Sequence, residues 1–126
     1  MATSRLSDST LEHFATVLQR RREELLHLMH ANDEALGQVR ESLSEGTNDD
    51  EHDPEGPTMS DEWSKLTGLQ AEGVTELREL DAALERISNH EFGMCASCGT
   101  AIGRPRLEAR PYTTLCIDCA RKAETH

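Results

Sequence analysis

Four cysteines stand in two pairs near the end of the chain, and they restrict its fold more than any other feature of the sequence. Two residues separate the cysteines within each pair, and residues 99–115 separate the pairs. This spacing is typical of a tetrahedral zinc site, whose thiolate ligands would be Cys95, Cys98, Cys116 and Cys119. Because four protein ligands leave no open position for water, the pattern predicts one structural Zn²⁺ and no catalytic one. Two disulfides are the alternative, and a reducing compartment favours metal over disulfides.

The rest of the chain has too few apolar residues for a large core. Of its 126 residues, 36% are hydrophobic and only 3% are aromatic, which is low for a globular domain. We therefore expect exposed helices held by a metal, and no pocket-forming core large enough for a substrate. The net charge of −11 argues against non-specific binding to nucleic acid. No apolar run is long enough for a signal peptide or a membrane span, so the expected compartment is the cytoplasm.

A first helix is predicted from Ser7 to Ser44, because no proline interrupts this segment and apolar residues recur at steps of three and four. The expected seam residues are Leu11, Phe14, Leu18, Leu25, Leu28, Leu36, Val39 and Leu43. Ser9 and Glu12 could form a capping box at its start, with Asp8 as an alternative cap, and Gly46 is a plausible stop.

A second helix is predicted to begin at Thr58 or Ser60 and to end near Asn89. Its seam residues would be Trp63, Leu66, Gln70, Gly73, Leu77, Leu80, Leu84 and Ile87, with Leu69 and Val74 broadening the stripe. Two amphipathic helices joined by a short turn predict an antiparallel coiled-coil hairpin, because neither apolar stripe is stable in water alone. The fold class is therefore mainly α.

The segment between the two helices, residues 46–57, is rich in acids and turn-forming residues. We expect it to be the tip loop of a hairpin domain spanning residues 1–89. Its acids are Asp49, Asp50, Glu51, Asp53 and Glu55, and two prolines would stiffen the loop that presents them. Such a tip could enter a narrow cavity that is positively charged or holds Mg²⁺.

Residues 90–126 are expected to form the zinc-finger module. Gly99 permits the positive φ that a cysteine knuckle often needs, and the spacer 99–115 favours short strands and turns. A short terminal helix from about Cys116 toward Glu124 would place the second pair at a helix N-terminus, which favours thiolates. Four arginines could offset the charge of the zinc–thiolate cluster: Arg104, Arg106, Arg110 and Arg121.

No catalytic constellation is present. The sequence has no recognisable Ser–His–Asp triad and no glycine-rich phosphate loop, so we expect no enzymatic activity. His27 and His30 are three residues apart on the first helix and could share a metal, but no carboxylate is compellingly placed as a partner. We interpret them as surface histidines.

The cysteine region resembles the DksA/TraR zinc-finger family. The resemblance rests on the run from Phe92 to Gly99, on Ile102, on the Arg-Leu-Glu-Ala-Arg-Pro stretch at 106–111, and on the run from Leu115 to Cys119. Within that stretch, Arg106, Glu108 and Arg110 are candidate supports of the zinc module. The resemblance implies a transcription factor that binds RNA polymerase directly, without sequence-specific DNA contact. It also implies that the hairpin enters the secondary channel of the polymerase.

The resemblance further implies that acids at the tip of the hairpin act near the polymerase active centre. The family's tip motif is Asp-x-x-Asp-x-Ala, and the nearest match runs from Asp50 to Glu55, with Asp53 as the second acid. Glu51 also belongs to it, and Glu55 stands where the family has Ala. Several members act with the alarmone ppGpp, which makes ppGpp a candidate ligand.

Two other functions are compatible with the same residues. A coiled-coil scaffold that docks another partner would need only the hairpin and a structural zinc. A zinc-ribbon nucleic-acid binder would use the basic residues Arg104, Arg106, Arg110, Arg121 and Lys122, although the overall charge opposes it. For the leading function we expect a monomer without a membrane partner.

Overall fold

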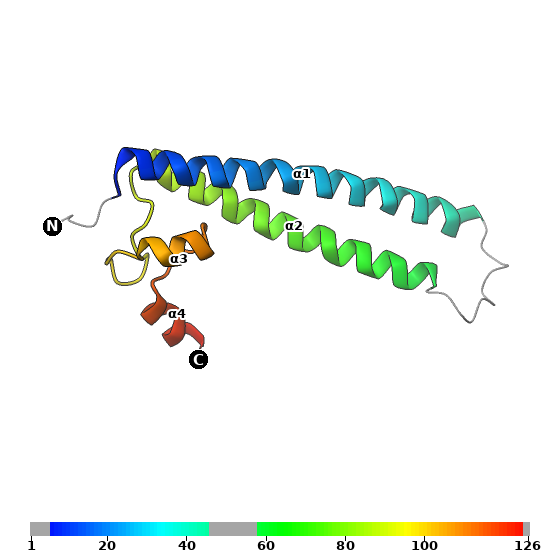
Figure 1. Cartoon of the computed structure of the whole chain (residues 1–126). Helices are drawn as coiled ribbons and strands as arrows, with labels where there is room; N and C mark the ends of the chain where they lie inside the picture. The colour runs from blue at the N-terminus through cyan, green and yellow to red at the C-terminus, as the bar shows by residue number, and fades with distance from the viewer. Residues whose placement is uncertain (1–5, 46–57, 125–126) are drawn as a thin grey trace. The chain divides into compact units, whose positions relative to one another are not determined.

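The computed structural model describes residues 6–45 and 58–124, and within these ranges the protein is mainly helical (Figure 1). The helices, in chain order, are α1 (Asp8–Glu45), α2 (Met59–Ser88), α3 (Arg104–Ala109) and α4 (Ile117–Glu124). The only β-pairing in the described ranges is an isolated antiparallel bridge between Met94 and Ala101. The predicted mainly α class, with a helical hairpin and a short terminal helix, is confirmed.

The chain divides into two compact units, and each contains part of α1 and part of α2. The terminal unit comprises residues 1–22 and 78–126, and the middle unit comprises residues 23–77. None of the helices in the described ranges is both long enough and apolar enough to cross a lipid bilayer.

Hydroxyl side chains begin both long helices. The Ser7 Oγ accepts a hydrogen bond from the backbone N–H of Thr10, at 3.1 Å, so Ser7 caps α1. The predicted capping box from Ser9 is wrong, because the helix already begins at Asp8 and Ser9 lies inside its first turn. In α2, the Thr58 Oγ1 accepts from the backbone N–H of Asp61 at 2.9 Å, which selects the earlier of the two predicted starts. The proposed stop at Gly46 lies outside the described residues.

The α2 helix ends with a left-handed residue that is not glycine. His90 has a φ of 61°, and its backbone N–H donates to the carbonyl of Ile87 at 3.1 Å. The next N–H, of Glu91, donates to the carbonyl of Arg86 at 2.8 Å. These two bonds form a Schellman motif, which satisfies carbonyls that the helix end would otherwise leave open.

The core of the terminal unit gathers residues from α1, α2, α3 and the segments around the cysteines. Phe14, Leu18, Leu80, Ala83 and Leu107 are fully buried, and Phe92 and Ile102 are nearly so. The spacer between the cysteine pairs was predicted to hold strands and turns, but residues 104–109 form α3 instead. Pro105 lies in the first turn, where proline suits a helix because its missing N–H would have no partner there, and Leu107 anchors the helix in the core.

In the middle unit the seam between α1 and α2 departs from the prediction. Leu36, Val39 and Leu66 are buried as expected, with Ala35 and Trp63 packed against them. However, Leu28 and Leu43 are 58% and 44% exposed, and the flanking residues Leu69 and Val74 are exposed as well. Met29 contacts α2 in place of Leu28, because a step of four from Leu25 follows the 3.6-residue helical period where a step of three drifts off the seam.

Candidate metal centre

The first cysteine pair lies in a tight knuckle of the terminal unit. The backbone N–H of Cys95 donates to the carbonyl of Thr100 at 2.7 Å, and that of Gly99 donates to the carbonyl of Cys95 at 3.0 Å. Gly99 has a φ of 80°, so the predicted positive φ is confirmed. Inside the knuckle, the backbone N–H groups of Ser97 and Cys98 lie 3.4 and 3.5 Å from the Cys95 sulfur, where they stabilise a thiolate.

The second pair lies at the start of α4, as predicted. Cys116 directly precedes the helix, and its carbonyl accepts the backbone N–H of Ala120 at 2.9 Å. Cys119 lies in the first turn. A hydrogen bond from the backbone N–H of Ala96 to the carbonyl of Thr114, at 2.8 Å, joins the segment before this pair to the first knuckle.

The two pairs converge so that the four sulfur atoms lie within 4.8 Å of one another. The Cys98 and Cys116 sulfurs are 3.8 Å apart, and none of the four cysteines forms a disulfide. Zinc–sulfur bonds of about 2.3 Å in a tetrahedron would set neighbouring sulfurs about 3.8 Å apart. The donor set and its spacing therefore fit Zn²⁺. Cys95 and Cys116 are buried, whereas Cys98 is exposed beside the Thr100 hydroxyl, which is the main cause of its lowered pKa.

The pKa values of two thiols in the cluster are shifted in opposite directions. The pKa of Cys95 is lowered to about 6, first by the backbone N–H of Cys116 and then by that of Cys98. The pKa of Cys119 is raised to about 12: the hydroxyl of Ser97 lowers it, but the Cys116 thiol, burial and the other two cysteines together raise it more. Thiols packed this closely cannot all ionise side by side without a cation. A divalent metal ion removes that repulsion, which is a second reason why the cluster suits zinc.

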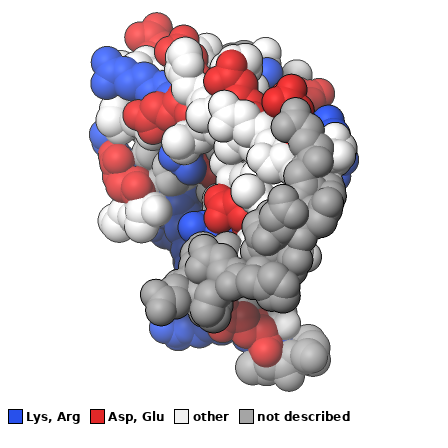
Figure 2. All heavy atoms as spheres, turned by 90° about the vertical axis from the view of Figure 1, so that its right-hand side faces the viewer, with Lys and Arg blue, Asp and Glu red and all other residues white. Residues whose placement is uncertain are grey.

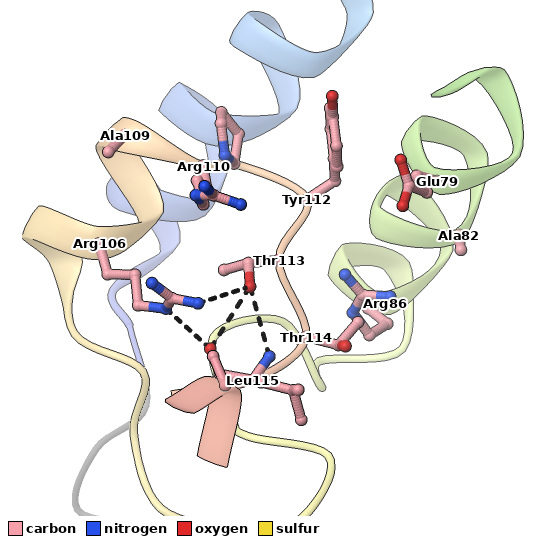
Figure 3. A pocket seen from close by; sticks show the side chains of 12 residues that line it. Glu79, Ala82, Arg86, Arg106, Ala109, Arg110, Tyr112, Thr113, Thr114 and Leu115 are labelled. Carbon is pink, nitrogen blue, oxygen red and sulfur yellow. Dashed lines mark hydrogen bonds between the residues drawn. The ribbon is translucent and has the colours of Figure 1, made fainter. Parts of the chain in front are cut away.

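The candidate supports of the zinc module act on its backbone and packing. The Arg106 Nε donates to the carbonyl of Leu115 at 2.9 Å, which holds the residue directly before Cys116 (Figure 3). The carboxylate of Glu108 accepts from the Arg104 Nε at 3.1 Å and lies 3.3 Å from the His13 Nε2. Glu108 thereby links α3 to α1 within the terminal unit.

Comparisons with known proteins place the chain in a family. A family model described as the prokaryotic dksA/traR C4-type zinc finger matches residues 90–124. The RNA polymerase-binding transcription factor DksA of Salmonella typhimurium is 32% identical over 120 residues, which cover 94% of this chain and 74% of that protein. The chain belongs to the DksA/TraR family. The protein of the same name from Escherichia coli K12 matches with the same identity and coverage.

Solved structures of DksA proteins share the fold. Transcription factor DksA2 from Pseudomonas aeruginosa matches with a TM-score of 0.79 and 26% identity, covering 94% of this chain and 86% of that one. The DnaK suppressor protein from Agrobacterium tumefaciens is 32% identical, with a TM-score of 0.54 and coverage of 88% and 91%. The family to which this chain belongs consists of regulators and not of enzymes, in agreement with the prediction from the sequence.

The DksA/TraR fold of this chain also forms a pocket that the sequence analysis did not predict. The pocket has a volume of about 630 Å³ and lies wholly in the terminal unit (Figure 3). It is lined by Glu79, Ala82 and Arg86 of α2, by Arg106 and residues 109–115, and by Ala120. No periodic sequence pattern could have revealed it, because half of its lining residues belong to the irregular segment between α3 and α4.

Arginine side chains give this pocket its charge. Arg86 is half-buried, burial lowers its pKa, and the nearby Glu91 carboxylate acts in the opposite direction. Its Nη2 atom is buried and donates to no acceptor among the described residues. Arg110 also lines the pocket, and its backbone N–H closes α3 by donating to the carbonyl of Arg106 at 2.8 Å. The one carboxylate on the wall is that of Glu79.

The other predicted site residues lie apart from this centre. The acidic tip residues Asp50, Glu51, Asp53 and Glu55 lie outside the described residues. His27 and His30 are exposed on α1, and His30 pairs with Glu34 one helical turn later at 3.4 Å. Neither histidine belongs to a group of potential metal ligands within the described ranges.

Proposed function

We propose that this chain binds RNA polymerase and regulates transcription without being an enzyme. The observation that carries the proposal is its similarity, over 94% of its length, to proteins named RNA polymerase-binding transcription factor. We further propose that it acts in the cytoplasm as a monomer and makes no sequence-specific contact with DNA. On the face in Figure 2, acidic side chains are scattered among the basic ones, which supports a protein partner over a nucleic-acid backbone.

The zinc module in this proposal is structural. Cys95, Cys98, Cys116 and Cys119 each supply one thiolate, and the metal joins the knuckle to α4. Arg106 holds the residue before Cys116 through its hydrogen bond to the Leu115 carbonyl, and Glu108 links α3 to α1 through His13. The backbone N–H of Arg110 closes the end of α3. When bound, the zinc supplies a tetrahedral anchor and no reactive position.

Metal analysis of the purified protein tests this part. We expect one zinc per chain, loss of zinc in Cys116→Ser, and retention of zinc in Ser88→Ala, which changes an exposed residue at the end of α2. A metal-free native protein with four titratable thiols would contradict the proposal.

The hairpin in this proposal is the part that reaches the polymerase. We propose that it enters the secondary channel and that the loop 46–57 acts there through Asp50 and Asp53, with Glu51 and Glu55 adding charge. The antiparallel course of α1 and α2 supports this, since their facing ends, Glu45 and Met59, bracket the acidic loop. The excess of acids, with a net charge of −11, also suits a basic or Mg²⁺-containing channel.

A pair of variants separates the tip from the rest of the hairpin. Asp50→Asn with Asp53→Asn removes two charges from the loop, and Asp33→Asn with Glu41→Gln removes two exposed charges from α1 as the matched control. Both proteins should bind zinc and pull down RNA polymerase, and only the loop variant should lose its effect on transcription in vitro. If the loop variant regulates as well as the wild type, the role of the tip is wrong. If no form binds polymerase, the proposed function itself is wrong.

We also propose the pocket of the terminal unit as the place where ppGpp would bind. Arg86 and Arg110 offer cationic donors to phosphates, and the buried Nη2 of Arg86, which has no acceptor among the described residues, supports an anionic ligand. Titration of ppGpp against the protein, alone and with polymerase, tests this with Arg110→Ala and, as control, Arg121→Ala outside the pocket. Weaker binding in Arg110→Ala alone is expected, and equal binding by both variants would contradict the assignment.

A further inference from the structure

The middle unit contains a close approach between α1 and α2 at Gly73. A Cβ atom on Gly73 would lie 2.9 Å from both the Cγ and the Sδ of Met29. Real Cβ atoms essentially never come so close to another heavy atom, so a side chain at position 73 would have to displace the Met29 side chain. An unbranched thioether can bend over a glycine in this way, whereas a branched leucine cannot follow the same path.

A polar side chain lies one turn from this contact. The Gln70 Nε2 donates to the backbone carbonyl of Met29 at 3.3 Å. The Gln70 Oε1 is buried and accepts no hydrogen bond from the described residues. Nearby seam residues of the same unit, such as Leu25 and Leu66, are buried and apolar, so a glutamine here costs stability relative to leucine.

Polar seam residues that reduce stability have one well-attested use, which is to fix register and association state. We propose that Gln70, Gly73 and Met29 form a register lock that pairs α2 with α1 in one alignment and disfavours self-association of the hairpin. A shift of α2 by seven residues toward the C-terminal end of α1 would set Gly73 opposite Leu36. The branched Leu36 side chain cannot fill the space above Gly73 as Met29 does. The amide of Gln70 would then also lose its hydrogen bond to Met29. The lock concerns the hairpin alone and is tested without polymerase.

The first test replaces the polar member. Gln70→Leu is expected to raise the melting temperature by about 5 °C, because it removes a buried acceptor without a partner. It should also double the amide signals of the middle unit in ¹H–¹⁵N spectra or raise the mass measured by light scattering. Gln38→Leu, which adds the same side chain at an exposed position of α1, should do neither. A monomer with one set of signals and an intact nuclear Overhauser contact between the Met29 methyl and Gly73 would overturn the proposal.

The second test does not depend on the first and uses the direction in which Gly73→Ala shifts the melting temperature. Gly73→Ala improves helix propensity but brings the new Cβ against Met29, so it should lower the melting temperature of the wild type. In the Met29→Ala background the space is free, and the same change should raise the melting temperature. If Gly73→Ala is stabilising in both backgrounds, the close contact does not govern the pairing and the lock is refuted.

Discussion

The contact between Phe14 and Phe92 gives the most quantitative prediction for the terminal unit. Phe14 of α1 is fully buried, and Phe92, between α2 and the first cysteine, is 4% exposed. Their ring centroids are 5.4 Å apart at an angle of 43°, and the Arg104 guanidinium lies 5.9 Å from the Phe14 ring. The pair therefore joins the start of α1 to the segment that enters the zinc knuckle.

Its contribution can be estimated from general values. Truncating a buried phenylalanine to alanine costs about 3–5 kcal/mol, a large fraction of the roughly 5–15 kcal/mol that stabilises a small protein. Leucine keeps most of the apolar volume and should cost about 1–1.5 kcal/mol at either position. An aromatic pair contributes about 0.5–1.5 kcal/mol beyond burial, so Phe14→Leu and Phe92→Leu should show a coupling of about 1 kcal/mol.

Urea unfolding at saturating zinc, followed by circular dichroism at 222 nm, measures this double-mutant cycle. Trp63, the one tryptophan of the chain, lies in the middle unit, so its fluorescence reports separately whether that unit unfolds in the same transition. As a control, Phe14→Leu combined with Leu66→Ala of the middle unit should be additive within about 0.5 kcal/mol. A coupling between the two phenylalanine changes of less than about 0.3 kcal/mol would show that the rings stabilise the unit only through their separate burial.

Three further predictions concern single interactions. His90→Gly should stabilise the protein by about 1 kcal/mol in urea unfolding, because glycine adopts the positive φ at the end of α2 without strain; an equal or lower stability would argue against the Schellman ending. The pKa of Glu108 is lowered, first by Arg104, so its contribution to stability is present above its unfolded pKa of about 4.3 and is lost as the pH falls through the lower folded value. Thermal melts should therefore show Glu108→Gln less stable than the wild type at pH 7, with the difference shrinking below about pH 4. The Arg22 Nε lies 2.7 Å from the Asp81 carboxylate, and because both side chains are exposed, a double-mutant cycle should give a coupling of only about 0.2–1 kcal/mol that weakens in 1 M salt.

The features that the sequence predicted well depend on neighbours along the chain. The cysteine spacing predicted a cluster of four thiols, and Gly99 predicted the positive φ of the knuckle, because both follow from a few consecutive residues. The two long helices were predicted within a residue or two for the same reason. The start of α1 was mistaken locally, since Ser7, Asp8 and Ser9 are all good caps and only the hydrogen bond to Thr10 distinguishes them.

The features that were missed depend on packing between distant segments. The helix α3 contains Pro105, which reads as a turn in sequence, and it forms because Leu107 enters a core that α1 supplies from nearly a hundred residues away. In the same way, Leu28 and Met29 are both apolar in sequence, and only the structure shows that Met29 is the one that lies against Gly73 of the other helix. For this reason the apolar pattern of a single helix identifies a hairpin, whereas its register has to be read from both helices together.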